Sequence, residues 1–229
     1  GEFIYISKAF GPFWGFIFGW AQLLIIRTSP AAGISLITAN YIGFFINIDK
    51  FQKNALAVLI IILFGIINYV GVEKASYYNK FSSIIKTLGI VVFVISGMTI
   101  YGADFSNLQL TIQPTQNLGP IGNFVAASIL VLFSFLGWDR VGYVAGEMKD
   151  PKKTIQLTMF YGISLISTIY LGANLLYHTV LGLDGVRGSI IVASDTASIL
   201  FGNKGAILIS LVVIISATGS INGTMMSAS

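Results

Sequence analysis

The chain has 229 residues, of which 55% are hydrophobic and 10% are charged. Soluble domains carry about 25% charged residues, so this composition and a mean hydropathy of +0.84 exclude an ordinary soluble domain and indicate an integral membrane protein. The net charge of +4 is scattered without a basic block, which argues against nucleic-acid binding, and zero cysteines with one histidine leave no thiolate or multi-histidine metal site.

Six apolar stretches predict six membrane spans in an all-α protein. They cover about residues 12–46, 55–72, 78–102, 122–148, 151–181 and 204–229. The first span is long enough to tilt, or to bend near Ser29–Pro30. Only residues 103–120 and 182–203 leave room for structure outside the membrane.

The orientation of these spans follows from the basic residues beside them. The loops on one side carry Lys8, Lys74, Lys80, Lys149, Lys152 and Lys153, and the opposite loops carry Lys50, Lys53, Arg187 and Lys204. Six against four is a weak bias that places the loop 150–153 in the cytoplasm. Because the chain begins without Met and stops in an apolar stretch, we expect one partial transmembrane domain over 1–229, an internal piece of a longer transporter.

Two small motifs have structural interpretations. Gly11, Gly15 and Gly19 lie four residues apart and favour close helix packing inside a bundle over a dimer interface. Asn222-Gly-Thr224 matches a glycosylation acceptor, but it lies inside a predicted span, so we interpret the match as chance.

The fourth span is interrupted at Ser134–Gly137. Lipid offers no partners for freed backbone groups, so a break at membrane depth is typical of transporter sites, where half-helix ends bind a substrate or ion. Carbonyl groups of Ser134, Phe135, Leu136 and Gly137 suit an ammonium, and N–H groups suit a carboxylate. Phe133 precedes the break and is a candidate gate over the ligand, although an aromatic residue in a span usually belongs to the core.

Four charged residues fall within predicted spans: Arg27, Lys86, Asp139 and Arg140. Intramembrane charges are functional candidates because each needs a partner or water. For Asp139 two roles stay open, the anchoring of the second half-helix and a contact with a substrate amine. For Arg27 a structural pair is favoured over substrate contact.

Lys86 is the most informative of these charges, because it lies about 10 Å along its helix from Tyr78. It shares a helical face with polar and small residues that predicts an inward-facing stripe. The stripe consists of Asn79, Ser82, Ser83, Lys86, Gly89 and Gly97. A fixed ammonium there can substitute for a bound metal cation; the alternative is a lysine whose ammonium reaches the interface.

In these segments the chain resembles the amino acid–polyamine–organocation superfamily, in its L-type amino acid transporter branch, which includes bacterial serine/threonine-type exchangers. The matching segments are EFIYISKAFGPFWGFIFGW, LLIIRTSP, NYVGVEKASYYNKFSSIIKTLGI, FSFLGWDRVGYVAGEMKDPKKTI and GSINGT. They follow one another along nearly the whole chain, and the fourth is the most specific.

The resemblance implies a LeuT-like bundle with a five-plus-five inverted repeat, of which this chain supplies helices three to eight. It implies that Phe133 is the aromatic gate, that Ser134–Gly137 is the unwound segment, and that Lys86 occupies the place of a metal ion in sodium-coupled relatives. Trp138 matches a recurring family Trp. Leu136 stands where L-type members with large substrates often have Gly, and therefore favours small substrates.

The predicted function is sodium-independent exchange of small neutral amino acids across the plasma membrane by alternating access. The predicted partners are the substrate and the lipid bilayer; no cofactor or metal is expected, and an accessory subunit stays unknown. The alternatives are a cationic amino acid or polyamine carrier, for which only Asp139 supplies a negative charge, and a non-transporting membrane assembly subunit. An enzyme is not expected, because the sequence shows no nucleophile–base pair or cofactor motif.

Overall fold

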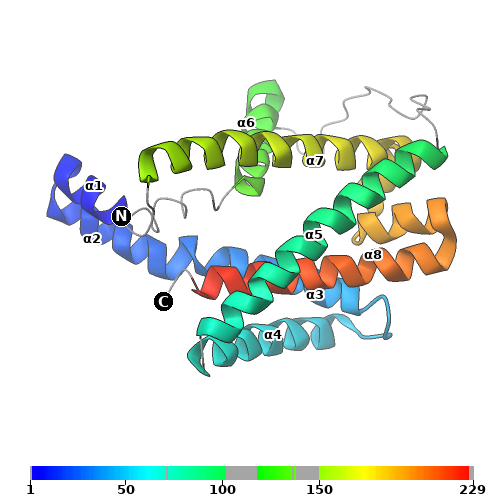
Figure 1. The fold of residues 1–229 in the computed structure, drawn as a ribbon, viewed down its shortest axis with the longest axis horizontal. Coiled ribbons are helices and arrows are strands. Elements are labelled where there is room, and N and C mark those ends of the chain that lie inside the picture. The colour runs from blue at the N-terminus through cyan, green and yellow to red at the C-terminus, as the bar shows by residue number, and fades with distance from the viewer. Residues whose placement is uncertain (1, 71, 102–117, 136, 138–149, 227–229) are drawn as a thin grey trace. The chain divides into compact units, whose positions relative to one another are not determined.

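The computed structural model describes residues 2–70, 72–101, 118–135, 137 and 150–226, and each regular element in this part of the chain is a helix (Figure 1). In chain order the elements are α1 (Glu2–Phe10), α2 (Pro12–Ala21), the π-helix η1 (Gln22–Ile26), α3 (Thr28–Ile42), α4 (Lys50–Val70), α5 (Val72–Tyr101), α6 (Gly119–Ser134), α7 (Pro151–Gly188) and α8 (Val192–Met226). The chain divides into two compact units, one of residues 109–168 and one of residues 2–108 with 169–229.

The segment from α2 to α3 contains a π-helical turn. The N–H of Arg27 donates to the carbonyl of Gln22 at 3.1 Å, five residues back. The irregularity at Gln22–Arg27 thus lies just before Ser29–Pro30, near which a bend is predicted. Since α3 begins at Thr28, Pro30 lies in a first helical turn, where the missing N–H leaves no bond unmade.

The glycines of α2 allow α1 to approach closely, as their spacing predicts. Gly11 forms the turn between the helices with a φ of 95°, which favours glycine. A Cβ on Gly15 would overlap the Ser7 hydroxyl, and one on Gly19 would contact the Phe3 ring at 3.9 Å. The backbone of α2 at these glycines therefore packs directly against side chains of α1.

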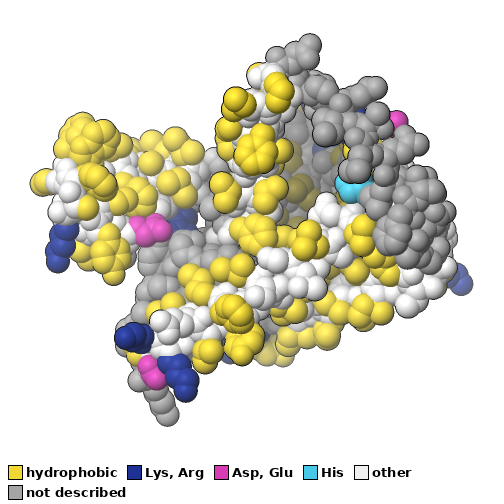
Figure 2. Space-filling view, turned by 90° about the horizontal axis from the view of Figure 1, so that it is seen from above, with side chains coloured by type: hydrophobic (Ala, Val, Ile, Leu, Met, Phe, Trp, Pro, Cys, Tyr) yellow, Lys and Arg dark blue, Asp and Glu magenta, His cyan; other side chains and the backbone are white. Residues whose placement is uncertain are grey.

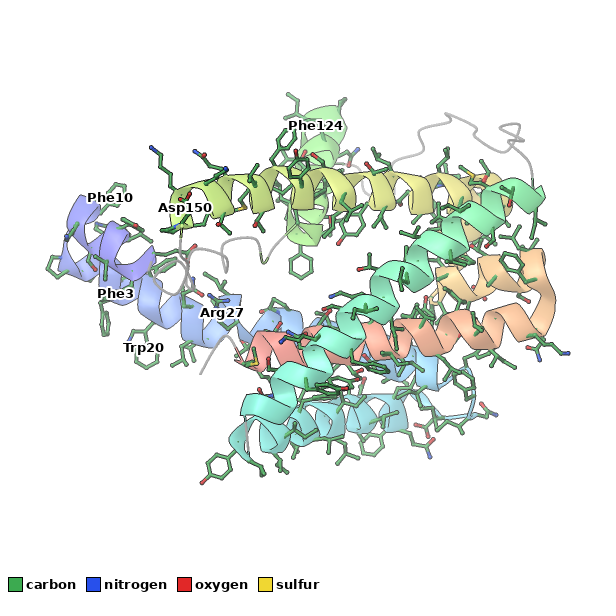
Figure 3. All side chains as sticks on the ribbon, viewed as in Figure 1. Phe3, Phe10, Trp20, Arg27, Phe124 and Asp150 are labelled. Carbon is green, nitrogen blue, oxygen red and sulfur yellow. The ribbon has the colours of Figure 1, made fainter. Side chains whose placement is uncertain are left out.

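Two helices start with acidic caps. Asp49 and Gln52 form a capping box before α4, in which the Gln52 N–H donates to Asp49 Oδ1 at 2.8 Å and the Asp49 N–H donates to Gln52 Oε1 at 2.9 Å. At the start of α7, the Oδ1 atom of Asp150 (labelled in Figure 3) accepts a hydrogen bond from the Lys153 N–H at 3.3 Å. Pro151 occupies the following position, where a proline suits the first turn.

In the unit of residues 2–108 and 169–229, helix α8 packs against α3, α4 and α5, and α5 crosses it in Figure 1. One buried cluster consists of Tyr41, Phe93, Leu176, Val180, Ala193, Ala197 and Ile209. A second cluster joins α4 to α8 through Ile60, Phe64 and Ile221. The core of this unit thus forms around α8.

The stretch 182–203, expected as a loop, is largely helical. Gly182 and Gly202 are the non-helical points inside α7 and α8, with φ values of 66° and 68°. Each glycine redirects the chain, so that short helical pieces lie between the two long ones. Ser189 Oγ donates to the Asp195 carboxylate at 2.5 Å and bridges these pieces.

The surface of the molecule is strongly apolar. Large side chains such as Ile121, Phe124 and Leu130 on α6 are 81%, 72% and 71% exposed, and hydrophobic side chains cover much of the face in Figure 2. In the described residues, five helices are long and apolar enough to cross a membrane: Pro12–Ile42, Lys50–Val70, Ser76–Ile100, Pro151–Gly188 and Val192–Met226. This is the surface of a multi-pass membrane protein.

Candidate functional site

Helix α6 ends at Ser134. Phe135 follows with φ −98° and ψ 8°, outside the helical range, and Gly137 has a φ of 110°. A φ near 110° favours glycine, because a Cβ would clash with the backbone there. The chain therefore leaves the helix within the segment where the sequence predicts the interruption.

The last turn of α6 is held by local hydrogen bonds. The Phe135 N–H donates to the Leu132 carbonyl at 3.1 Å, and the Ser134 hydroxyl donates to the Val131 carbonyl at 2.7 Å. Phe133 is 51% exposed, while Phe135 and Gly137 are half-buried. The aromatic ring predicted as a gate thus projects from the final turn of the helix.

The length of α6 fits a helix that stops inside a membrane. Its 16 residues span about 24 Å at 1.5 Å per residue, against a hydrocarbon core of about 30 Å. The C-terminal end of a helix carries partial negative charge. A cationic group such as a substrate ammonium is stabilised at such an end.

Lys86 lies near the middle of the apolar stretch Ser76–Ile100 of α5 and is half-buried. It makes no hydrogen bond or ion pair with any residue that the structure describes. Lys86 belongs to the unit of residues 2–108 and 169–229, whereas α6 belongs to the other unit. A site shared by Lys86 and the end of α6 is accordingly a proposal.

The polar stripe of α5 packs on α8. Ser82 is fully buried and donates to the Ile215 carbonyl at 3.1 Å. A Cβ on Gly219 would overlap the Ser82 hydroxyl, and a Cβ on Gly89 would come within 2.6 Å of Val212. The stripe that contains Lys86 therefore faces the bundle, as its spacing predicts.

A polar cluster joins α4, α5 and α8, and sequence reasoning missed most of it. Asn68 Nδ2 donates to Asn222 Oδ1 at 2.8 Å, and the Tyr78 hydroxyl lies 2.7 Å from Thr218 Oγ1. Because Thr218 already donates to Ile214, Tyr78 is the donor in that pair. The signal in the sequence that could have indicated this cluster is an asparagine within a span, such as Asn68, because buried amides in membranes form hydrogen bonds between helices.

Asn222 is fully buried, with 0% of its surface exposed. An oligosaccharide cannot be attached to a side chain that is packed between helices. The interpretation of Asn222-Gly-Thr224 as a chance match is therefore consistent with the structure.

Arg27 takes part in a structural relay. Its Nε donates to Gln22 Oε1 at 3.1 Å, and Gln22 Nε2 donates to Glu2 Oε2 at 3.0 Å. The π-helical turn brings residues five apart onto one face, which lets Gln22 reach Arg27 (labelled in Figure 3). This relay links α1 to η1 and supports the structural role expected for Arg27.

Several predicted site residues lie outside the described part of the chain. They are Leu136, Trp138, Asp139 and Arg140. In the described part, His, Asp and Glu side chains form no group able to hold a metal ion.

A mostly helical, apolar chain with five helices long enough to cross a membrane among the described residues defines a class of protein, the multi-pass membrane proteins. The sequence profile of the amino acid permease family matches residues 1–229. The chain therefore belongs to this family, which is part of the amino acid–polyamine–organocation superfamily expected from the sequence.

The relatives support the same family. The chain is 26% identical to the serine/threonine exchanger SteT of Bacillus subtilis over 99% of this chain and 51% of the relative. It is 25% identical to the rabbit (Oryctolagus cuniculus) b(0,+)-type amino acid transporter 1 over 100% of this chain and 47% of that relative. It is 27% identical to the human cystine/glutamate transporter over 100% of this chain and 46% of that relative. The chain thus spans about half the length of these curated relatives.

Proposed function

We propose that the protein containing this chain is a secondary transporter that exchanges small neutral amino acids across the plasma membrane. The observation that carries the proposal is the end of α6 at Ser134, after 16 residues. A helix that stops within the hydrocarbon needs hydrogen-bond donors for its terminal carbonyl groups, because lipid supplies none. A substrate ammonium is a suitable donor. The family match supports an amino acid as that substrate.

Substrate binding is proposed at Phe133, Ser134, Phe135, Leu136 and Gly137. Backbone groups of the unwound segment hold the ammonium and carboxylate, which all amino acids share. The Phe133 ring closes over the bound substrate. Since half of the Phe133 surface is exposed at the end of α6, its ring is available for such a contact.

Lys86 is proposed to remove the need for sodium. Lys86 lies on the same helical face of α5 as residues that pack on α8. Its ammonium has no hydrogen-bond or ion-pair partner among the described residues, and a charge at membrane depth is costly unless it serves a function. In our proposal it supplies the positive charge that a bound metal ion would supply in a sodium-coupled carrier. Uptake should then be unchanged when sodium is replaced by choline.

The size of the substrate is proposed to depend on Leu136. A leucine in place of glycine removes pocket volume, which favours alanine, serine or threonine over leucine. The names of the relatives, which include a serine/threonine exchanger and a cystine/glutamate transporter, differ in substrate. The preference must therefore be measured on this protein.

The test is uptake of labelled serine into proteoliposomes that contain the full-length protein. We expect at least tenfold faster uptake into vesicles loaded with serine than into empty ones, with or without sodium. Unlabelled alanine and threonine should compete, and leucine, arginine and putrescine should not. Equal uptake into empty vesicles would refute exchange, and stronger competition by arginine or putrescine would favour the cationic alternative.

Retained folding without any serine binding would favour an assembly subunit. Binding is measured by the serine-dependent rise in the thermal unfolding midpoint of the purified protein. A rise is expected for a carrier. Its absence in a folded, monodisperse sample would contradict the transport proposal itself.

A further inference from the structure

An apolar groove of about 580 Å³ lies between α5 and α8. It is lined by Leu88, Gly89, Val92, Phe93, Ser96, Phe201, Lys204, Gly205, Leu208 and Ile209. All of these residues belong to the unit of residues 2–108 and 169–229. None of its lining residues belongs to the segment Phe133–Gly137 proposed for substrate binding.

The groove has a polar end and an apolar end. Lys204 follows the Gly202 kink by two residues, where the long helical piece of α8 begins. Along α5 the lining runs from Ser96 to Leu88, about 12 Å at 1.5 Å per residue. Because Gly97 on α5 packs near Leu200, Ser96 lies toward the Lys204 end, and Leu88 lies deeper in the span.

The walls are open and hydrocarbon-like. Leu88, Val92 and Leu208 are 60%, 62% and 65% exposed. Gly89 also lines the groove, and the place where its Cβ would lie is taken by the Val212 side chain of α8, 2.6 Å away. Such walls offer dispersion contacts to a flexible chain but few hydrogen bonds to a polar ligand.

Lys204 is the one charged residue among the lining residues. Its side chain is exposed and makes no hydrogen bond or ion pair with any residue in the described ranges. A lysine at the end of a span places its ammonium at the level of the lipid headgroups. The groove therefore pairs one exposed cation, just after the Gly202 kink of α8, with an apolar trough.

We propose that this groove binds a glycerophospholipid, with the phosphate on Lys204 and one acyl chain along Val92 and Leu208. A phospholipid likewise has a charged headgroup at one end and acyl chains at the other, so its charge and its hydrocarbon match the two ends of the groove. A sterol lacks the anion that Lys204 would bind, and an amino acid lacks the chain that the walls would cover. Lipid tails surround every span, so the specificity comes from the phosphate contact and from the shape of the trough.

The experiment is a titration of the purified full-length protein with phosphatidylglycerol, followed by native mass spectrometry. The variants are Lys204→Ala, Lys204→Arg and Val92→Trp, and the matched control is Lys50→Ala, an exposed lysine at the start of α4 outside the groove. We expect Lys204→Ala to weaken binding roughly fivefold, the effect of one cation at a membrane surface. Lys204→Arg should retain binding, and Val92→Trp should abolish it.

Each other outcome overturns the proposal. Equal lipid retention in all variants would mean that only annular lipid is bound. Loss in Val92→Trp with no change in Lys204→Ala would overturn the phosphate contact, as would equally tight binding of cholesterol. Because Lys204 is exposed, its variants are expected to fold, and a monodisperse elution profile checks this before the titration.

Discussion

Lys86 is a cation in the middle of an apolar helix, half-buried and without a hydrogen bond or ion pair among the residues that the structure describes. It shares a helical face with Ser82 and Gly89, both of which pack on α8. An ammonium in this position is retained at an energetic cost, which is typical of functional charges in membranes.

The first prediction concerns the charge of Lys86. Lys86→Met keeps the aliphatic stem and removes the ammonium. Serine exchange should therefore fall about tenfold to a hundredfold, the loss expected if the positive charge contributes about 1.5–3 kcal/mol to the transport cycle. The measurement is exchange in proteoliposomes at equal protein content. Lys80→Met, an exposed lysine of the same helix, is the control and should exchange normally. Full activity of Lys86→Met would remove Lys86 from the mechanism.

The second prediction concerns the buried amide pair. Asn222→Ala removes the acceptor of the 2.8 Å bond from Asn68 and should lower the free energy of unfolding by about 1 kcal/mol, the scale of hydrogen bonds between helices in membranes. The thermal unfolding midpoint in detergent should fall accordingly. Asn203→Ala, an exposed residue, should leave the midpoint unchanged, and equal midpoints for both variants would contradict a role for the amide pair.

At the scale of elements, the contact between α5 and α8 depends on small residues. Ser82 and Gly219 face each other so closely that the glycine has no room for a Cβ. The spacing of small residues in both helices indicated close packing, but only the packed structure pairs particular positions.

The third prediction follows from this pairing. Gly219→Ala should destabilise the protein by about 1–3 kcal/mol through overpacking, and the double variant Ser82→Gly/Gly219→Ala should recover most of the loss. Gly65→Ala is the control, since nothing lies within 4 Å of its Cβ position. A double variant no more stable than Gly219→Ala alone would contradict the contact. Thermal unfolding of the four proteins measures these differences.

The fourth prediction concerns the kink in α8. Gly202 has a φ of 68° and a ψ of −167°, with no atom near its Cβ position. This conformation is essentially restricted to glycine, so Gly202→Ala should cost about 1–3 kcal/mol from backbone strain alone. Gly202→Asn should cost a similar amount, because asparagine tolerates the left-handed helical region but not this one. The unfolding midpoints of both variants should therefore lie below that of the native protein. An alanine variant as stable as the native protein would mean that the kink straightens.

At the scale of the whole molecule, membrane topology is accessible because the chain contains no cysteine. The candidate span Pro151–Gly188 lies between the loop at 150–153 and the Gly202 kink. The six-span arrangement predicted from the sequence would place these two points on opposite sides of the membrane.

The fifth prediction is a labelling pattern. Lys152→Cys should react with an impermeant maleimide only from the cytoplasmic side, and Asn203→Cys only from the opposite side, because one span separates them. The measurement compares intact cells with inside-out vesicles. Labelling of both positions from the same side would contradict the span between them.

The sequence determined the class of this protein, because apolar stretches of spanning length and scarce charge have one physical solution in a membrane. It also determined the family, whose profile matches residues 1–229, and the point where α6 ends, since that point depends on local residue order around Phe133–Gly137. The tertiary structure decided the position of the π-helical turn at Gln22–Ile26 and the burial of Asn222 against Asn68. These features depend on which helices meet and at what rotation, and contacts between residues distant in sequence fix that choice.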